Sequence, residues 1–79
     1  MGVKNATREM IPFIDYMPDE YTGKMSKAHL KFMAERIING DMDIEKCNRW
    51  LGYIQGVLCA AEVTTVDEIA YLTAEYFKK

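Results

Sequence analysis

This chain has few of the residues that build covalent cross-links and metal centres. It contains two cysteines, Cys47 and Cys59, and one histidine, His29. If one helix holds both cysteines, they lie about 18 Å apart along its axis, which is too far for an intrachain disulfide. His29 has no Cys-x-x-Cys or His-x-x-x-His partner in the sequence. We therefore expect no metal site and no cofactor.

The sequence also lacks a long hydrophobic run, a signal peptide and a strong net charge. Its longest apolar run is far shorter than the roughly 18 residues that a membrane-spanning helix needs. Reduced cysteines and the absence of a signal peptide indicate the cytosol. The formal net charge is −2, with acidic and basic residues mixed along the chain. This balance disfavours a nucleic-acid binder that relies on a general positive field, and it is too weak for an acidic DNA mimic.

No constellation of residues typical of catalysis is present. Asp41 and Asp43 resemble the start of a calcium loop, but no glycine and glutamate follow at the required offsets. His29 and Cys47 could in principle form a base and a nucleophile, although a surface histidine and a buried cysteine explain them more simply. The acidic residues of the N-terminal third are expected to be solvated in a loop: Asp15, Asp19 and Glu20. We expect a protein that is not an enzyme.

The length of 79 residues is enough for a single small domain. The helical periodicity described below predicts an all-α domain over residues 1–79, built as a three-helix bundle with an N-terminal arm. A chain of this size has a thin core and a total stability of about 4–12 kcal/mol. Oligomerisation is an ordinary way for so small a domain to bury more surface.

The predicted arm covers residues 1–23 and contains both prolines, Pro12 and Pro18. Each proline opposes a long helix and biases the preceding residue towards extended geometry, so only a short helical turn over residues 5–11 is expected. The arm is rich in large apolar side chains. It either lies across the helices and closes the core, or exchanges onto a second subunit or a partner. Its candidate contact residues are Phe13, Tyr16 and Tyr21.

The first predicted helix covers residues 26–38. Ser26 is a favourable N-cap because its hydroxyl can accept a hydrogen bond from a free backbone N–H group. Asn39 and Gly40 then stop the helix, since both residues tolerate the left-handed conformation. The apolar face of this helix has the spacing of helical turns and consists of Leu30, Met33, Ala34 and Ile37.

The second predicted helix covers residues 43–61 and is expected to be the central one. Asp41 or Asp43 can cap it. Apolar residues repeat along it in alternating steps of three and four: Ile44, Cys47, Leu51, Ile54, Leu58 and Ala61. A second apolar stripe lies beside the first and widens the core-facing surface: Trp50, Tyr53 and Val57.

The third predicted helix covers residues 65–77. Thr65 is followed three positions later by Glu68, which is the spacing of a capping box. Acidic residues in the first turn also suit the positive end of the helix dipole. The apolar stripe of this helix consists of Ile69, Leu72 and Tyr76.

The middle of the central helix carries two glycines, Gly52 and Gly56. Each glycine costs an exposed helix interior about 1 kcal/mol relative to alanine. At 100° per residue they fall on a narrow polar face of low relief, with these candidate contact residues: Asn48, Arg49, Gly52, Gln55, Gly56, Cys59 and Ala60. The face could pack against another part of the chain, or form a helix–helix contact with a second subunit or a foreign protein. It could also be a small-ligand groove.

The segment Asn48-Arg49-Trp50-Leu51-Gly52-Tyr53-Ile54-Gln55-Gly56-Val57-Leu58, followed by Thr65-Val66-Asp67-Glu68, carries a family resemblance. It resembles small uncharacterised proteins of tailed bacteriophages, in which an R-W-[LI]-G-[FY]-[IV]-Q-G-x-L helix precedes a T-[IV]-D-E helix start. The resemblance covers residues 45–70. It implies a phage accessory protein that acts in the host bacterial cytoplasm. Such proteins often bind and disable a host factor, including antiviral defence systems.

Three hypotheses for function follow. The first is a homodimeric protein-binding module that modulates a host protein and counteracts antiviral defence. The second is a protein that sequesters a small nucleotide-like ligand at a subunit interface, through Arg49 and stacking on Trp50 or a tyrosine. The third, which the charge balance disfavours, is a nucleic-acid-binding helical domain whose basic side consists of Lys24, Lys27, Lys31 and Arg36.

Overall fold

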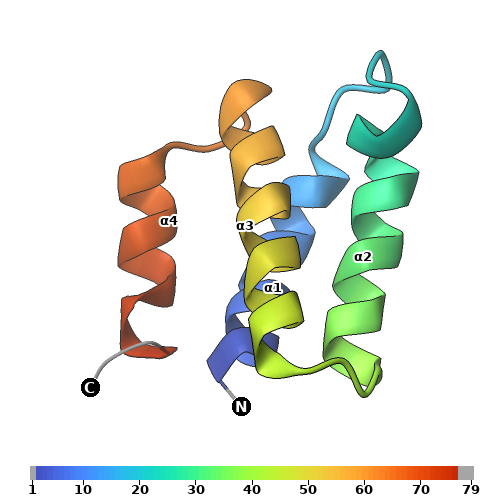
Figure 1. Cartoon of the computed structure of the whole chain (residues 1–79). Helices are drawn as coiled ribbons and strands as arrows, with labels where there is room; N and C mark the ends of the chain where they lie inside the picture. The colour runs from blue at the N-terminus through green and yellow to red at the C-terminus, as the bar shows by residue number, and fades with distance from the viewer. Residues whose placement is uncertain (1, 77–79) are drawn as a thin grey trace.

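The computed structural model describes residues 2–76, and all of the regular secondary structure in this range is helical (Figure 1). Its elements follow in the order α1 (Gly2–Asp15), η1 (Gly23–Met25), α2 (Lys27–Asn39), α3 (Ile44–Ala60), α4 (Val66–Thr73) and η2 (Ala74–Tyr76), where η denotes a 3-10 helix. No strand occurs within residues 2–76. The all-α prediction is therefore confirmed, although the bundle has four α-helices rather than three.

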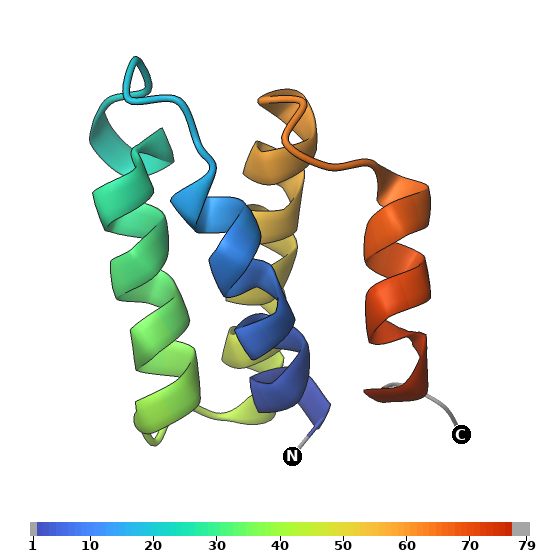
Figure 2. The same ribbon diagram turned by 180° about the vertical axis from the view of Figure 1, so that it is seen from behind.

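The core lies where α1, α2 and α3 meet. Figure 2 shows α1 in front of α3, with α2 on one side of α1 and α4 on the other. α4 makes its main contacts outside its own segment with α1 rather than with α3. The side chains that are almost fully enclosed come from the first three helices: Val3, Met10, Ile14, Leu30, Ile37, Cys47, Ile54 and Leu58.

The N-terminal third differs from the predicted arm, because residues 2–15 form the complete helix α1. One face of α1 is buried, with the i, i+3 and i+4 spacing of an amphipathic helix: Val3, Ala6, Thr7, Met10 and Ile14. Pro12 lies in the last turn, where it leaves the carbonyl of Arg8 without its helical partner. Both residues are exposed, so water can satisfy that carbonyl. Burial of the opposite face outweighs the local preference of proline.

Two of the three candidate arm residues pack onto the core of their own chain. Phe13 and Tyr21 are partly buried against the core cluster, and Met17 between them is almost fully buried. Tyr16 instead points outward, with 81% of its surface exposed. These positions agree with the interpretation in which the N-terminal third closes the core.

The helices α2, α3 and α4 overlap the three segments in which the sequence predicts helices, but α4 ends at Thr73 and residues 74–76 form the 3-10 helix η2. Phe77, the last residue of the third predicted helix, lies outside the described residues. Each helix is capped by a side-chain oxygen that accepts a hydrogen bond from the backbone N–H three residues later. The donor–acceptor distances are 3.1 Å from His29 to Ser26, 2.8 Å from Lys46 to Asp43, and 3.1 Å from Glu68 to Thr65.

Two helix ends differ in detail from expectation. Gly40 follows α2 with φ −95°, which is not left-handed. A methyl group at Gly40 would collide with the carbonyl oxygen of Arg36, so the position requires glycine for close approach. At the start of α4, the carboxylate of Glu68 accepts a hydrogen bond from the hydroxyl of Thr64. A capping box would instead have this carboxylate accept a hydrogen bond from the backbone N–H of Thr65.

The C-terminal end of the described chain contacts α1 through a hydrogen bond and a close approach of the two backbones. The phenol of Tyr76 donates a hydrogen bond of 2.9 Å to Oε2 of Glu9. A methyl group at Gly2 would collide with the carbonyl oxygen of Tyr76, so the two backbones also approach closely. The hydrogen bond to Glu9 raises the pKa of Tyr76, and partial loss of solvent and the negative charges of Glu9 and Glu75 raise it further.

This raised pKa predicts a specific loss of stability in alkali. The neutral phenol is favoured in the folded state, so its contribution is fully present below the ordinary tyrosine pKa of 10.0 and is lost as the pH rises through the higher folded value. We expect the free energy of unfolding of Tyr76→Phe to fall less steeply with pH above about 10 than that of the wild type. Urea denaturation across this range measures the slope. Tyr71→Phe, at a position 84% exposed, should retain the wild-type slope; equal slopes in both variants would contradict the assignment.

Candidate functional site

The candidate contact face is the outer face of α3, defined by Asn48, Arg49, Gly52, Gln55, Gly56, Cys59 and Ala60. The opposite face of α3 is buried in the core through Cys47, Ile54 and Leu58. Gln55 and Cys59 are partly buried, and the other members of the outer face are exposed. The structure thus brings the predicted residues together on one side of the helix.

Gly52 and Gly56 have open space above them. A methyl group at either position meets no heavy atom within 4 Å among residues 2–76, outside its own stretch of helix. The interpretation that these glycines admit a neighbouring part of the same chain is therefore wrong for the described residues. The reason is the placement of α4, which packs mainly on α1 and reaches the outer face of α3 only at its edge, beside Gln55 and Cys59.

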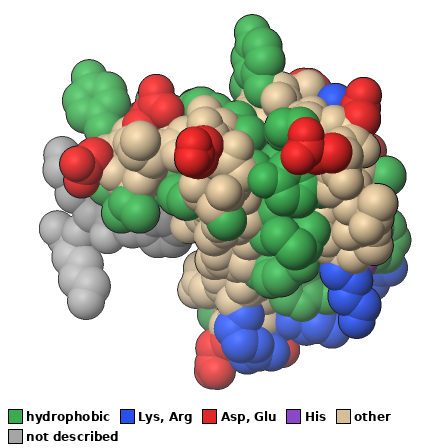
Figure 3. Space-filling model, turned by 90° about the horizontal axis from the view of Figure 1, so that it is seen from above, with side chains coloured by type: hydrophobic (Ala, Val, Ile, Leu, Met, Phe, Trp, Pro, Cys, Tyr) green, Lys and Arg blue, Asp and Glu red, His purple; other side chains and the backbone are tan. Residues whose placement is uncertain are grey.

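Two shallow apolar hollows adjoin this face and meet at Gly56. On one side, Met25 and Tyr53 contribute to a hollow of about 280 Å³ that also reaches Ala60. On the other side, Cys59 and Val66 contribute to a hollow of about 170 Å³ between α3 and α4. Figure 3 looks down on this end of the bundle and shows hydrophobic side chains gathered on its surface. The bare glycine row thus has apolar side chains on both flanks.

A third hollow lies between η1, α2 and α3, and we call it the Trp50 hollow. It has a volume of about 390 Å³ and is lined by Lys24, His29, Met33, Trp50 and Tyr53. The hydroxyl of Tyr53 donates a hydrogen bond of 2.8 Å to the carbonyl oxygen of Lys24. Arg49, the cation expected beside an aromatic ring in a ligand groove, does not line this hollow.

The sequence indicated Trp50 or a tyrosine as a stacking residue beside Arg49 at a subunit interface, but it did not predict the Trp50 hollow, because the stripe that contains Trp50 and Tyr53 was assigned to the core. Trp50 is only partly buried, and Tyr53 is 39% exposed. Their angular position around the helix axis could have indicated this exposure, because both residues lie at the edge of the apolar stripe of α3 and not at its centre. The turn that carries Lys24 completes the hollow, and no local pattern places that turn beside α3.

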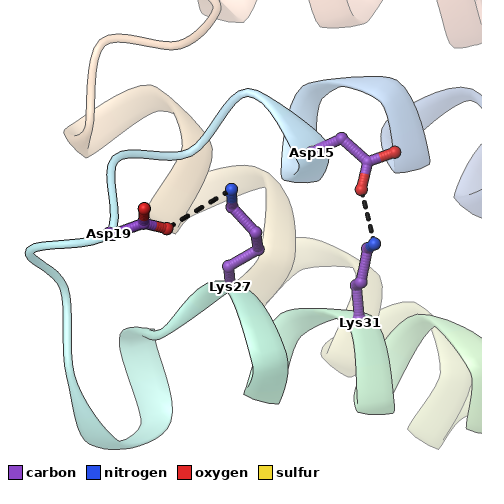
Figure 4. A network of polar contacts seen from close by, with 4 residues as sticks. All are labelled: Asp15, Asp19, Lys27 and Lys31. Atoms are coloured by element: carbon purple, nitrogen blue, oxygen red, sulfur yellow. Dashed lines mark ion pairs between the residues drawn. The ribbon is translucent and has the colours of Figure 1, made fainter.

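The basic side predicted for α2 is partly neutralised by the end of α1 and the turn that follows it (Figure 4). Nζ of Lys31 lies 2.6 Å from Oδ1 of Asp15, and Nζ of Lys27 lies 3.5 Å from Oδ1 of Asp19. Two of the four expected basic residues are thus engaged within the chain. The acidic group of the N-terminal third is a partner for these lysines, which weakens the case for nucleic-acid binding.

The two cysteines lie in different surroundings. Cys47 is buried in the core, while Cys59 is partly exposed, and both thiols are free. Among residues 2–76, no group of three or more His, Cys, Asp or Glu side chains is placed to hold a metal ion. Nor does this part of the chain contain a helix long and apolar enough to cross a membrane.

Comparisons with known proteins give no further guide to function. No protein-family model matches the chain, and no curated protein or solved structure matches it at a significant level. Function must therefore be inferred from the residues and the geometry described above.

The open space above the two outer glycines predicts that alanine is favourable there. We expect Gly52→Ala and Gly56→Ala each to raise the free energy of unfolding of the isolated chain by up to about 1 kcal/mol, because alanine restricts the unfolded chain and favours helix. Urea denaturation at low protein concentration measures this change.

Gly40→Ala is the matched control for these two variants. It should destabilise the fold, because its methyl group meets the carbonyl oxygen of Arg36. If Gly52→Ala and Gly56→Ala destabilise the chain as Gly40→Ala does, the description of an open outer face is incorrect.

Proposed function

We propose that this chain is a small bacteriophage accessory protein that binds and modulates a host protein and is not an enzyme. It acts as a homodimer in the host bacterial cytoplasm, and the modulation counteracts antiviral defence. The contact surface is the outer face of α3. The observation that carries the proposal is the exposed pair Gly52 and Gly56, above which the chain itself places nothing within 4 Å among residues 2–76.

The two glycines make an isolated chain less stable. Together they weaken α3 by about 2 kcal/mol relative to alanine, against a total stability of about 4–12 kcal/mol for a domain of this length. No contact within the described chain offsets this loss. A second helix that packs directly on the glycines would offset it, because two backbones can approach closely only where side chains are small.

The flanks of the outer face suit a protein partner. Val66, on one side, is 71% exposed, while Met25 and Tyr53, on the other, are each 39% exposed. Burial of these side chains would supply the apolar centre of an interface. Asn48 and Arg49 are exposed near the start of the glycine row, where they can form part of a polar rim. The same surface can serve two copies of the chain or one copy and a host protein.

Sedimentation tests the dimer. We expect the wild type to be a dimer at high micromolar concentration and the double variant Gly52→Leu/Gly56→Leu to be a folded monomer, because the leucine side chains block close approach yet meet open space in the monomer. Glu35→Leu is the matched control, since it adds an exposed leucine on α2, away from the outer face of α3, and should remain dimeric. A monomeric wild type would contradict the dimer.

Affinity capture from a bacterial host lysate tests the host partner. The tagged wild type and Glu35→Leu should retain the same host protein in stoichiometric amount, and Gly52→Leu/Gly56→Leu should lose it. Recovery of that protein by all three forms would show that the outer face of α3 is not the binding surface. Failure of the wild type to retain any host protein would contradict the proposed function.

A further inference from the structure

We propose that the Trp50 hollow is a binding site for a small planar aromatic anion, a molecule with one or two fused rings and an acidic group. This inference goes beyond the proposed protein-binding function, because it assigns a small ligand to an adjoining hollow that shares only Tyr53 with the flank of the outer face. The hollow combines ring faces and an apolar floor with a lysine at its border. These are the elements that recognise an aromatic acid or a mononucleotide.

The aromatic wall of the hollow is held in place before any ligand binds. Trp50 is partly buried against the core, and Met33 beneath it is almost fully buried. Tyr53 is fixed at its far end by the hydrogen bond of 2.8 Å from its hydroxyl to the carbonyl oxygen of Lys24. Because Trp50 and Tyr53 lie one helical turn apart on α3, both rings border the same space. A planar ligand therefore meets side chains that lose little freedom on binding.

The charge around the hollow favours an anion, although the whole chain has a net charge of −2. Lys24 is among the lining residues, and Nζ of Lys46 lies 5.3 Å from the centroid of the Trp50 ring. Within the described chain, no lining residue of this hollow is acidic. An acidic group on a bound ring would thus meet Lys24 as the basic lining residue of the hollow, while Lys46 adds a positive charge beside the same tryptophan.

The size of the hollow favours a small molecule over a nucleic-acid strand. Its volume of about 390 Å³ lies at the lower end of the range of roughly 300–1,000 Å³ for ligand pockets. A strand would need a longer basic track for its successive phosphates. The track does not extend along α2 through Lys27 and Lys31, because both are paired with aspartates.

Trp50 is the only tryptophan of the chain, so its indole N–H gives one resonance that reports on the hollow. We would titrate the ¹⁵N-labelled chain with adenosine 5′-monophosphate and with 1-naphthoate. Adenosine, which lacks the charge, and inorganic phosphate, which lacks the ring, are the control probes. Both aromatic anions should shift the indole resonance saturably at up to millimolar concentration. Adenosine 5′-monophosphate should bind at least about threefold more tightly than adenosine, the factor expected for an exposed ion pair.

Lys24→Gln should weaken the binding of both anions about threefold. Lys31→Gln is the matched control, because that lysine pairs with Asp15 and does not line the hollow; it should leave both affinities unchanged. Three results would overturn the proposal: no saturable shift with either anion, equal affinities in the two variants, or tighter binding of an oligothymidylate than of adenosine 5′-monophosphate. The last result would assign this surface to nucleic acid instead.

Discussion

Burial of one face of α1 against α2 and α3 is the interaction on which the rest of the structure depends. Ala6, Met10 and Ile14 are fully enclosed, and the one polar group beside them is satisfied, because Oγ1 of Thr7 donates a hydrogen bond of 2.7 Å to the carbonyl oxygen of Val3. α4 joins the molecule mainly through α1. Figure 2 shows α1 in front of α3, between α2 on one side and α4 on the other, and nothing in residues 2–76 packs on Gly52 or Gly56.

The sequence was sufficient to predict α2, α3 and α4, because their determinants are local. Ser26, Asp43 and Thr65 each form the expected cap, and the apolar spacing identifies the buried faces. α1 was not predictable in the same way. Pro12 is a strong local sign against a helix, whereas the burial that outweighs it depends on contacts with α2 and α3.

The candidate site shows the same division between local and long-range information. The angular spacing of Gly52 and Gly56 placed them correctly on one face, but the space above them depends on where α4 packs. Tyr53 was assigned to the core, yet its hydroxyl reaches the carbonyl oxygen of Lys24, 29 residues away in the sequence. Periodicity places a side chain on a face of its own helix, while the partner of that face is set by the tertiary fold.

The open space above Gly52 and Gly56 supports the proposal that a second molecule packs on the outer face of α3. Amide ¹H–¹⁵N spectra recorded from low micromolar to millimolar concentration test this most directly, because they locate any contact residue by residue. We expect concentration-dependent changes at Gly52 and Gly56 and along the exposed side of α3, with the amides of the buried face of α1 unchanged. Spectra that do not change with concentration, or changes confined to α2 and η2, would contradict it.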